Sequence, residues 1–229
     1  MKKFSIIISF LFTFLLLSGQ DENTNMVKYT PDFKFEEGFF INFQQVKNNN
    51  PIPPSRVVTN LDYSSNSFYN EILKQKTLTF FDKVGAKHQV SLSDIWGFSR
   101  NGVLYIRVSQ GFHRITIIGG IGHFVADITT YESDYYDPYY YRMYNPYYSP
   151  YGYQPRTTQK TEMRQYLINF ETGKLFDYDR ESLEVLLMKD PELHDEYQEL
   201  RRRKKKQLKF MYIRKFNERN PIYFPESKY

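Results

Sequence analysis

Hydrophobic patterns with the two-residue period of a strand fill the middle of the chain, and patterns with the helical period appear only after residue 178. Residues 103–108, 112–118 and 122–131 each alternate β-branched or aromatic side chains with polar ones, and glycines separate them. The Asn101-Gly102 pair before the first run favours a tight turn. Three successive strands with short connections predict an antiparallel meander.

Shorter strand patterns lie on both sides of this meander. Residues 38–43 predict a short strand, and residues 77–81 and 88–90 predict a hairpin whose turn contains Gly85. Strand character resumes at residues 164–170. Because all of these runs precede the helical patterns, we expect an α+β fold, with an antiparallel sheet followed by C-terminal helices.

The start signals of the helices are specific. Asp179 is placed to cap a helix over residues 182–189. Asp190-Pro191-Glu192 then combines a capping side chain, a proline at the first helical position and an early acid. These signals predict two helix starts within a dozen residues.

From Pro191 we predict one long basic amphipathic helix that ends at Asn220-Pro221, about 28 residues and roughly 40 Å long. Its apolar side chains recur at Leu193, Tyr197, Leu200, Leu208, Met211, Tyr212 and Phe216. Lys204 fills the missing step on that face, where its methylene stem can lie along apolar surface. We therefore divide the chain into a β-rich part at 37–178, a helical part at 179–220 and a tail at 221–229.

The N-terminus has the layout of a secretory signal peptide over residues 1–20. Two lysines precede a 14-residue apolar run, and small residues follow it. The run is shorter than a membrane-spanning helix requires, although an uncleaved anchor is the alternative. With the signal removed, we expect no transmembrane span. No cysteine follows the run, so we predict an exported protein, periplasmic or secreted, that is not a lipoprotein. Residues 21–36 then predict a flexible leader.

No catalytic signature appears in the sequence. The chain contains no cysteine, which excludes disulfides, thiol catalysis and cysteine-ligated metals. Its four histidines are scattered without metal-ligand spacing, and we assign them structural or surface roles. The single tryptophan, Trp96, predicts a core or hairpin anchor. We predict neither a cofactor nor a metal, and the catalytic residues of any activity stay unknown.

A dense run of cations near the C-terminus is the first candidate contact surface. Its predicted contact residues are Arg201, Arg202, Arg203, Lys205, Lys206 and Lys209. One interpretation is a surface for anionic envelope components, such as lipid phosphates or acidic glycans, or for another envelope protein, without specific nucleic-acid binding. The other is a solvated helix face, neutralised by i,i+4 pairing with acids one or two turns upstream. Those acids are Glu192, Asp195, Glu196 and Glu199.

A tyrosine-rich segment at about residues 131–155 is the second candidate. Eleven of the 23 positions from 131 to 153 are tyrosine, interleaved with three prolines, which predicts a long low-complexity loop. Its possible aromatic contact residues are Tyr135, Tyr136, Tyr139, Tyr140, Tyr141, Tyr147 and Tyr148. The loop could stack on sugars or bases, associate with itself, or be a tolerated surface insertion.

Three stretches together give the chain a family resemblance. They are residues 37–51, residues 95–98 with 104–106, and residues 189–193 with 212–217. In these stretches the chain resembles a family of exported proteins from Bacteroidota-type bacteria to which no activity is assigned. The resemblance implies a secreted or periplasmic location, and it implies no reaction and no site residues.

Two function classes follow from these observations. The first is a non-catalytic envelope binding or scaffolding domain that uses the cationic run or the tyrosine-rich loop. The second is a hydrolase of cell-wall or polysaccharide material, which would need two carboxyl groups facing each other in a cleft.

Overall fold

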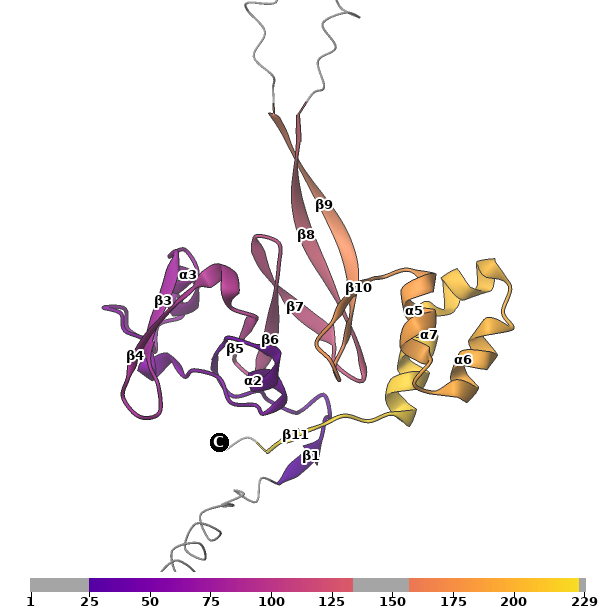
Figure 1. Ribbon diagram of the computed structural model, residues 1–229, viewed down its shortest axis with the longest axis horizontal. Helices are drawn as coiled ribbons and strands as arrows, with labels where there is room; N and C mark the ends of the chain where they lie inside the picture. Colours follow the sequence, from indigo (N-terminus) through magenta and orange to yellow (C-terminus); the bar gives the residue numbers. More distant parts are fainter. Residues whose placement is uncertain (1–24, 134–156, 227–229) are drawn as a thin grey trace, which may run out of the picture.

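The computed structural model of the chain describes residues 25–133 and 157–226 (Figure 1). The predicted signal peptide at 1–20 and the seven tyrosines proposed as aromatic contacts lie outside these residues. Within them, antiparallel sheets precede the C-terminal helices, which confirms the predicted α+β class.

The centre of the fold is a seven-stranded antiparallel sheet with the strand order β10-β9-β8-β7-β6-β5-β2. Its strands are β2 (Gly38–Phe40), β5 (Gly97–Arg100), β6 (Val103–Val108), β7 (Gly111–Ile117), β8 (Ile121–Ser133), β9 (Thr157–Asn169) and β10 (Leu175–Asp177). Strands β5 to β10 are neighbours in sequence order, so the predicted meander is confirmed and extended. Strand β2 pairs with β5 at one edge, and helix α2 (Phe43–Lys47) follows it.

Strands β8 and β9 form a hairpin of 13 paired positions, from Ile121–Asn169 to Ser133–Thr157. The outer part of this hairpin rises well beyond the rest of the sheet (Figure 1). Residues 131–133, which we had assigned to the loop, belong to β8, and β9 begins seven residues before the predicted strand. Thr161 favours this strand because its β-branched side chain suits a pleated backbone.

A smaller layer packs beside the sheet, at the left of Figure 1. It contains the predicted hairpin, β3 (Thr77–Phe81) paired with β4 (Lys87–Ser91). It also contains α3 (Phe68–Ile72) and the 3₁₀ turns η1 (Pro54–Arg56) and η2 (Leu92–Asp94). A core of ten buried apolar residues joins this layer to β2 and β5.

The leader and the tail are ordered where the structure describes them. Strand β1 (Met26–Lys28) pairs with β11 (Tyr223–Pro225), so the two ends of the chain lie side by side. Phe35 and Phe224 are buried and stack edge to face, with ring centroids 5.0 Å apart. The prediction of a flexible leader is therefore wrong from residue 25 on, because these aromatic side chains gain apolar burial from contacts distant in sequence.

Both predicted helix starts are confirmed. The Asp179 carboxylate accepts the Ser182 N–H at 2.7 Å at the start of α5 (Arg180–Leu187). Asp190 accepts the Leu193 N–H at 3.2 Å at the start of α6 (Pro191–Gln198). These caps satisfy N–H groups that the first helical turn leaves without partners.

The long C-terminal helix does not form as predicted. The segment divides into α6 and α7 (Arg202–Arg219), and the break lies at residues 199–201. Because the chain turns there, Tyr197 of α6 and Tyr212 of α7 pack together, with ring centroids 4.7 Å apart, and both are buried. A straight rod could not bring these two rings into contact. No helix among the described residues is long and apolar enough to cross a membrane.

The helices pack on the sheet through a core that Ile121 of β8 and Leu167 of β9 share with α5, α6 and α7. Asn217 of α7 fixes this contact: its side chain accepts the Ile121 N–H and donates to the Ile121 carbonyl, each at 2.9 Å. Gly119 makes room for that amide, because a Cβ there would lie 2.3 Å from Asn217 Cγ.

Candidate polyanion surface on helix α7

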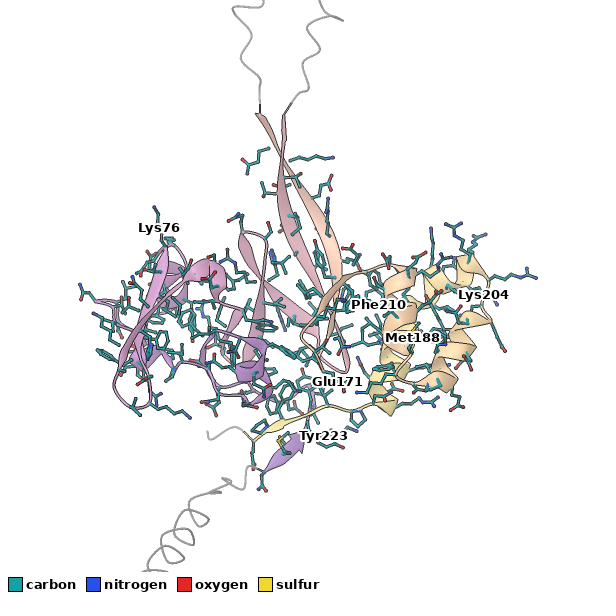
Figure 2. All side chains as sticks on the ribbon, in the orientation of Figure 1. Lys76, Glu171, Met188, Lys204, Phe210 and Tyr223 are labelled. Atoms are coloured by element: carbon teal, nitrogen blue, oxygen red, sulfur yellow. The ribbon has the colours of Figure 1, made fainter. Side chains whose placement is uncertain are left out.

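Five cations gather where α7 begins. They are Arg201, Arg202, Arg203, Lys204 and Lys206, and we call this set the basic end of α7. All five side chains are exposed. Lys204 marks their position at the tip of the helical part in Figure 2. Four of the six predicted contact residues therefore lie together at the surface, and Lys204 joins them.

Lys205 is not part of this surface, although the sequence placed it there. Its side chain is buried, and its ammonium donates to Glu184 Oε1 at 3.0 Å and to Gln198 Oε1 at 2.8 Å. We had placed Lys204 on the apolar face, but the buried stripe of α7 begins at Lys205, seven residues before Tyr212 and eleven before Phe216. That spacing is the signal in the sequence that identifies the correct lysine.

Lys209 is also engaged within the protein. Its ammonium donates to the Tyr178 carbonyl at 2.7 Å and lies 3.7 Å from the centroid of the Tyr178 ring. Burial lowers the pKa of Lys209 and raises the pKa of Tyr178 to about 12. The predicted contact role of Lys209 is therefore not supported, because its ammonium already binds Tyr178, which follows β10.

The acids of α6 do not neutralise the basic end as the solvated-face interpretation required. Glu196 instead pairs with Lys215 at 2.6 Å, and Glu192 pairs with Arg219 at 2.5 Å. Both partners lie in the C-terminal half of α7, because the break at 199–201 folds the acids of α6 back along that half. Within residues 25–133 and 157–226, no cation of the basic end has a carboxylate oxygen within 4.0 Å.

The position of these cations on the helix adds to their positive potential. The N-terminus of a helix carries the positive end of the peptide dipoles. The first turn of α7 contains no acid, and the N-cap residue Arg201 provides no side-chain cap. Anions are therefore favoured at this end by side-chain charge, by the dipole and by free N–H groups.

One of the four histidines, His123, packs inside the fold. His123 is buried between Gln165, whose Oε1 lies 3.1 Å from its Nε2, and the rings of Tyr178 and Phe210. Burial lowers the pKa of His123 and of His113. In the described part of the chain, no three His, Asp or Glu side chains are grouped so that they could hold a metal ion.

Comparison with known protein families, curated proteins and solved structures found no match to this chain. Evidence on function therefore comes from the chain's own residues and geometry.

Proposed function

We propose that the protein is an exported, non-catalytic domain that binds an anionic component of the cell envelope through the basic end of α7. The observation that carries this proposal is a cluster of five cations without carboxylate partners among the described residues, at the positive end of a helix dipole. Folding gains nothing from this arrangement, because like charges repel one another and oppose the dipole. The signal-peptide pattern at residues 1–20 supports the location.

The favoured partner is a surface of lipid phosphates. Lys204 lies at the tip of the helical part (Figure 2), and the other four cations of the basic end are exposed as well, so this end of the molecule can approach a flat charged surface. Three of the five are arginines, whose guanidinium groups can bind phosphate oxygens in pairs. An acidic glycan would present carboxylates or sulfates to the same residues and is the alternative that the experiment separates.

The experiment compares two variants of the full chain with equal charge loss. In the first, Arg201, Arg203, Lys204 and Lys206 become Gln. In the second, the control, Lys28, Lys76, Lys83 and Lys87 become Gln; these lysines are exposed and lie away from α7. Lys76 and Lys204 lie at opposite sides of the molecule in Figure 2. Both variants retain residues 1–20, so any lipid affinity of that segment is the same in each.

Binding is measured by sedimentation with phosphatidylglycerol–phosphatidylcholine vesicles, with pure phosphatidylcholine vesicles, and with soluble polygalacturonate. At about 1 kcal/mol per cation near an anionic surface, four substitutions should weaken vesicle binding roughly a hundred- to a thousandfold. Raising the salt from about 0.01 M to about 0.1 M should also weaken it, since the Debye length falls from about 30 Å to about 10 Å. Equal losses of vesicle binding in both variants, or an α7 variant that loses polygalacturonate binding but keeps vesicle binding, would contradict the proposal.

The hydrolase alternative lacks a favourable observation. The two clefts described below contain one carboxylate between them, Asp94. Glycoside hydrolysis normally requires a pair of carboxyl groups about 5 to 9.5 Å apart. We therefore propose binding and not hydrolysis.

A further inference from the structure

A row of three residues crosses strands β5, β6 and β7. Trp96 immediately precedes β5, and its carbonyl accepts the Arg107 N–H of β6 at 2.9 Å. Arg107 in turn is paired with Phe112 of β7. Arg107 and Phe112 therefore share the face toward the β3–β4 layer, whereas the Trp96 ring packs with Phe43 against the core on the other face.

The first cleft lies at the Trp96 end of this row and has a volume of about 520 Å³. Trp96 and Phe43 form its aromatic wall, with ring centroids 5.6 Å apart. Asn42, Ser93 and Asp94 also line this cleft. Asn42 Oδ1 accepts the Gln45 N–H and Asp94 Oδ1 accepts the Ser93 hydroxyl, so the Asn42 amide NH₂ and Asp94 Oδ2 are the groups left for a ligand among the described residues. The Trp96 indole N–H forms no hydrogen bond with any described residue. It is not a buried atom, so a ligand in the cleft can reach it. The cleft thus combines an aromatic surface with donors and acceptors that are available to a ligand.

The second cleft lies at the Phe112 end and has a volume of about 410 Å³. Its floor is aromatic: Phe98 and Tyr105 stack almost in parallel, with ring centroids 4.7 Å apart. Arg100 and Arg107 line it, and no carboxylate does. Neither arginine forms an ion pair with another described residue; each donates instead to a backbone carbonyl.

Arg107 belongs to both clefts and connects them. Its guanidinium donates to the Leu92 carbonyl and lies 5.7 Å from the centroid of the Phe112 ring. These contacts hold the charge in place and leave other guanidinium N–H groups able to bind a ligand, since the group carries five donors. A fixed, unpaired arginine between two aromatic surfaces is an anion-binding feature.

We propose that the two clefts form one binding site for an acidic saccharide. A sugar ring stacks on Trp96, because the face of a sugar presents C–H groups to an aromatic ring. Asp94 and Asn42 bind its hydroxyl groups. The acidic substituent of this ring, or of the next one, binds Arg107 and Arg100 over the aromatic floor. The combination of hydroxyl-binding groups beside Trp96 and unpaired arginines beyond it favours this ligand over a neutral sugar or a purely apolar molecule.

This site is independent of the function proposed for α7. It uses strands and turns of the β-rich part, whereas the basic end of α7 belongs to the helical part. Loss of vesicle binding in the α7 variant should therefore leave saccharide binding unchanged, and the two proposals can fail separately.

Trp96 is the only tryptophan in the chain, so its fluorescence reports on this cleft alone. The experiment titrates the full chain with trigalacturonic acid and, in parallel, with galactotriose as the neutral counterpart. We expect a saturable change in Trp96 emission with the acidic sugar, and binding of the neutral sugar weaker by about tenfold or more.

Three variants locate the interaction. Arg107→Gln should reduce the affinity for the acidic sugar to about that for the neutral one, and Asp94→Asn should weaken both sugars. Lys83→Gln, an equal charge change in the exposed β3–β4 turn, should alter neither. Thermal unfolding of each variant checks that the fold is intact. Absence of any saturable response to trigalacturonic acid, equal binding of the neutral sugar, or unchanged binding by Arg107→Gln would overturn the proposal.

Discussion

Reversing two charges at the start of α7 should stabilise the protein while it removes function. Arg202 and Arg203 occupy the first turn, where cations oppose the helix dipole and no acid compensates them. Replacing both by Glu exchanges two unfavourable interactions for two favourable ones. Each charge–dipole interaction is worth about 0.3 to 1 kcal/mol, and exposure favours the low end of that range. Two unfavourable interactions removed and two favourable ones added, at about 0.3 kcal/mol each, raise the free energy of unfolding by roughly 1 kcal/mol.

The gain is measured as a shift in the midpoint of thermal unfolding. For a chain of this size, about 1 kcal/mol corresponds to roughly 2 to 4 °C. Circular dichroism at low salt should show this rise, and the rise should shrink at high salt because both side chains are exposed. The same variant should lose most of its binding to phosphatidylglycerol vesicles. A midpoint that falls or stays constant at low salt would refute the electrostatic reasoning, since it would mean that Arg202 and Arg203 are already compensated.

Three further predictions concern the helical part and its contact with the sheet. Glu184→Ala leaves the buried Lys205 ammonium without its carboxylate and should lower the free energy of unfolding, measured in urea, by about 3 kcal/mol. Adding Lys205→Met to the same chain should restore most of this loss. Absence of that rescue would contradict the assigned ion pair. Gly119→Ala places a Cβ against the Asn217 amide and should lower the free energy of unfolding by about 2 kcal/mol. A change of less than about 0.5 kcal/mol would disprove the close contact. Burial lowers the pKa of His123 in the folded state, so the unfolded chain binds a proton near pH 6.5 that the folded chain does not. Stability should therefore fall as the pH drops below about 6.5, and His123→Gln should reduce that slope; an unchanged slope would show that His123 is not responsible.

Local chemistry was readable from the sequence wherever a structure depends on neighbouring residues. Asp179 and Asp190 cap helices through N–H groups three residues away, so their side chains could be assigned without knowledge of the fold. The β3–β4 hairpin and the meander likewise follow from alternation and short turns. The general class of the fold was therefore predictable.

Features that depend on distant contacts were not. Residues 199–201 contain no proline or glycine, and the helix breaks there because Tyr197 and Tyr212 bury each other. The pairing of β1 with β11 joins residues about 200 positions apart, which no local pattern reveals.

The candidate sites were only partly predictable for the same reason. The cationic run was visible in the sequence, but the break decides which of its members are exposed and where the acids of α6 bind. The Trp96 cleft combines residues of α2, η2, β6 and β10 and their flanks, and its composition emerges only when the sheet assembles.

Lysine reactivity tests the central claim most directly. The full chain is acetylated with a limiting reagent, free and bound to phosphatidylglycerol vesicles, and each lysine is quantified by mass spectrometry. We predict that vesicles slow the modification of Lys204 and Lys206, that Lys205 reacts slowly in both states because it is buried, and that Lys76 and Lys83 are unaffected. Equal protection of all exposed lysines, or protection confined to Lys76 and Lys83, would contradict the claim that the protein binds anions through the basic end of α7.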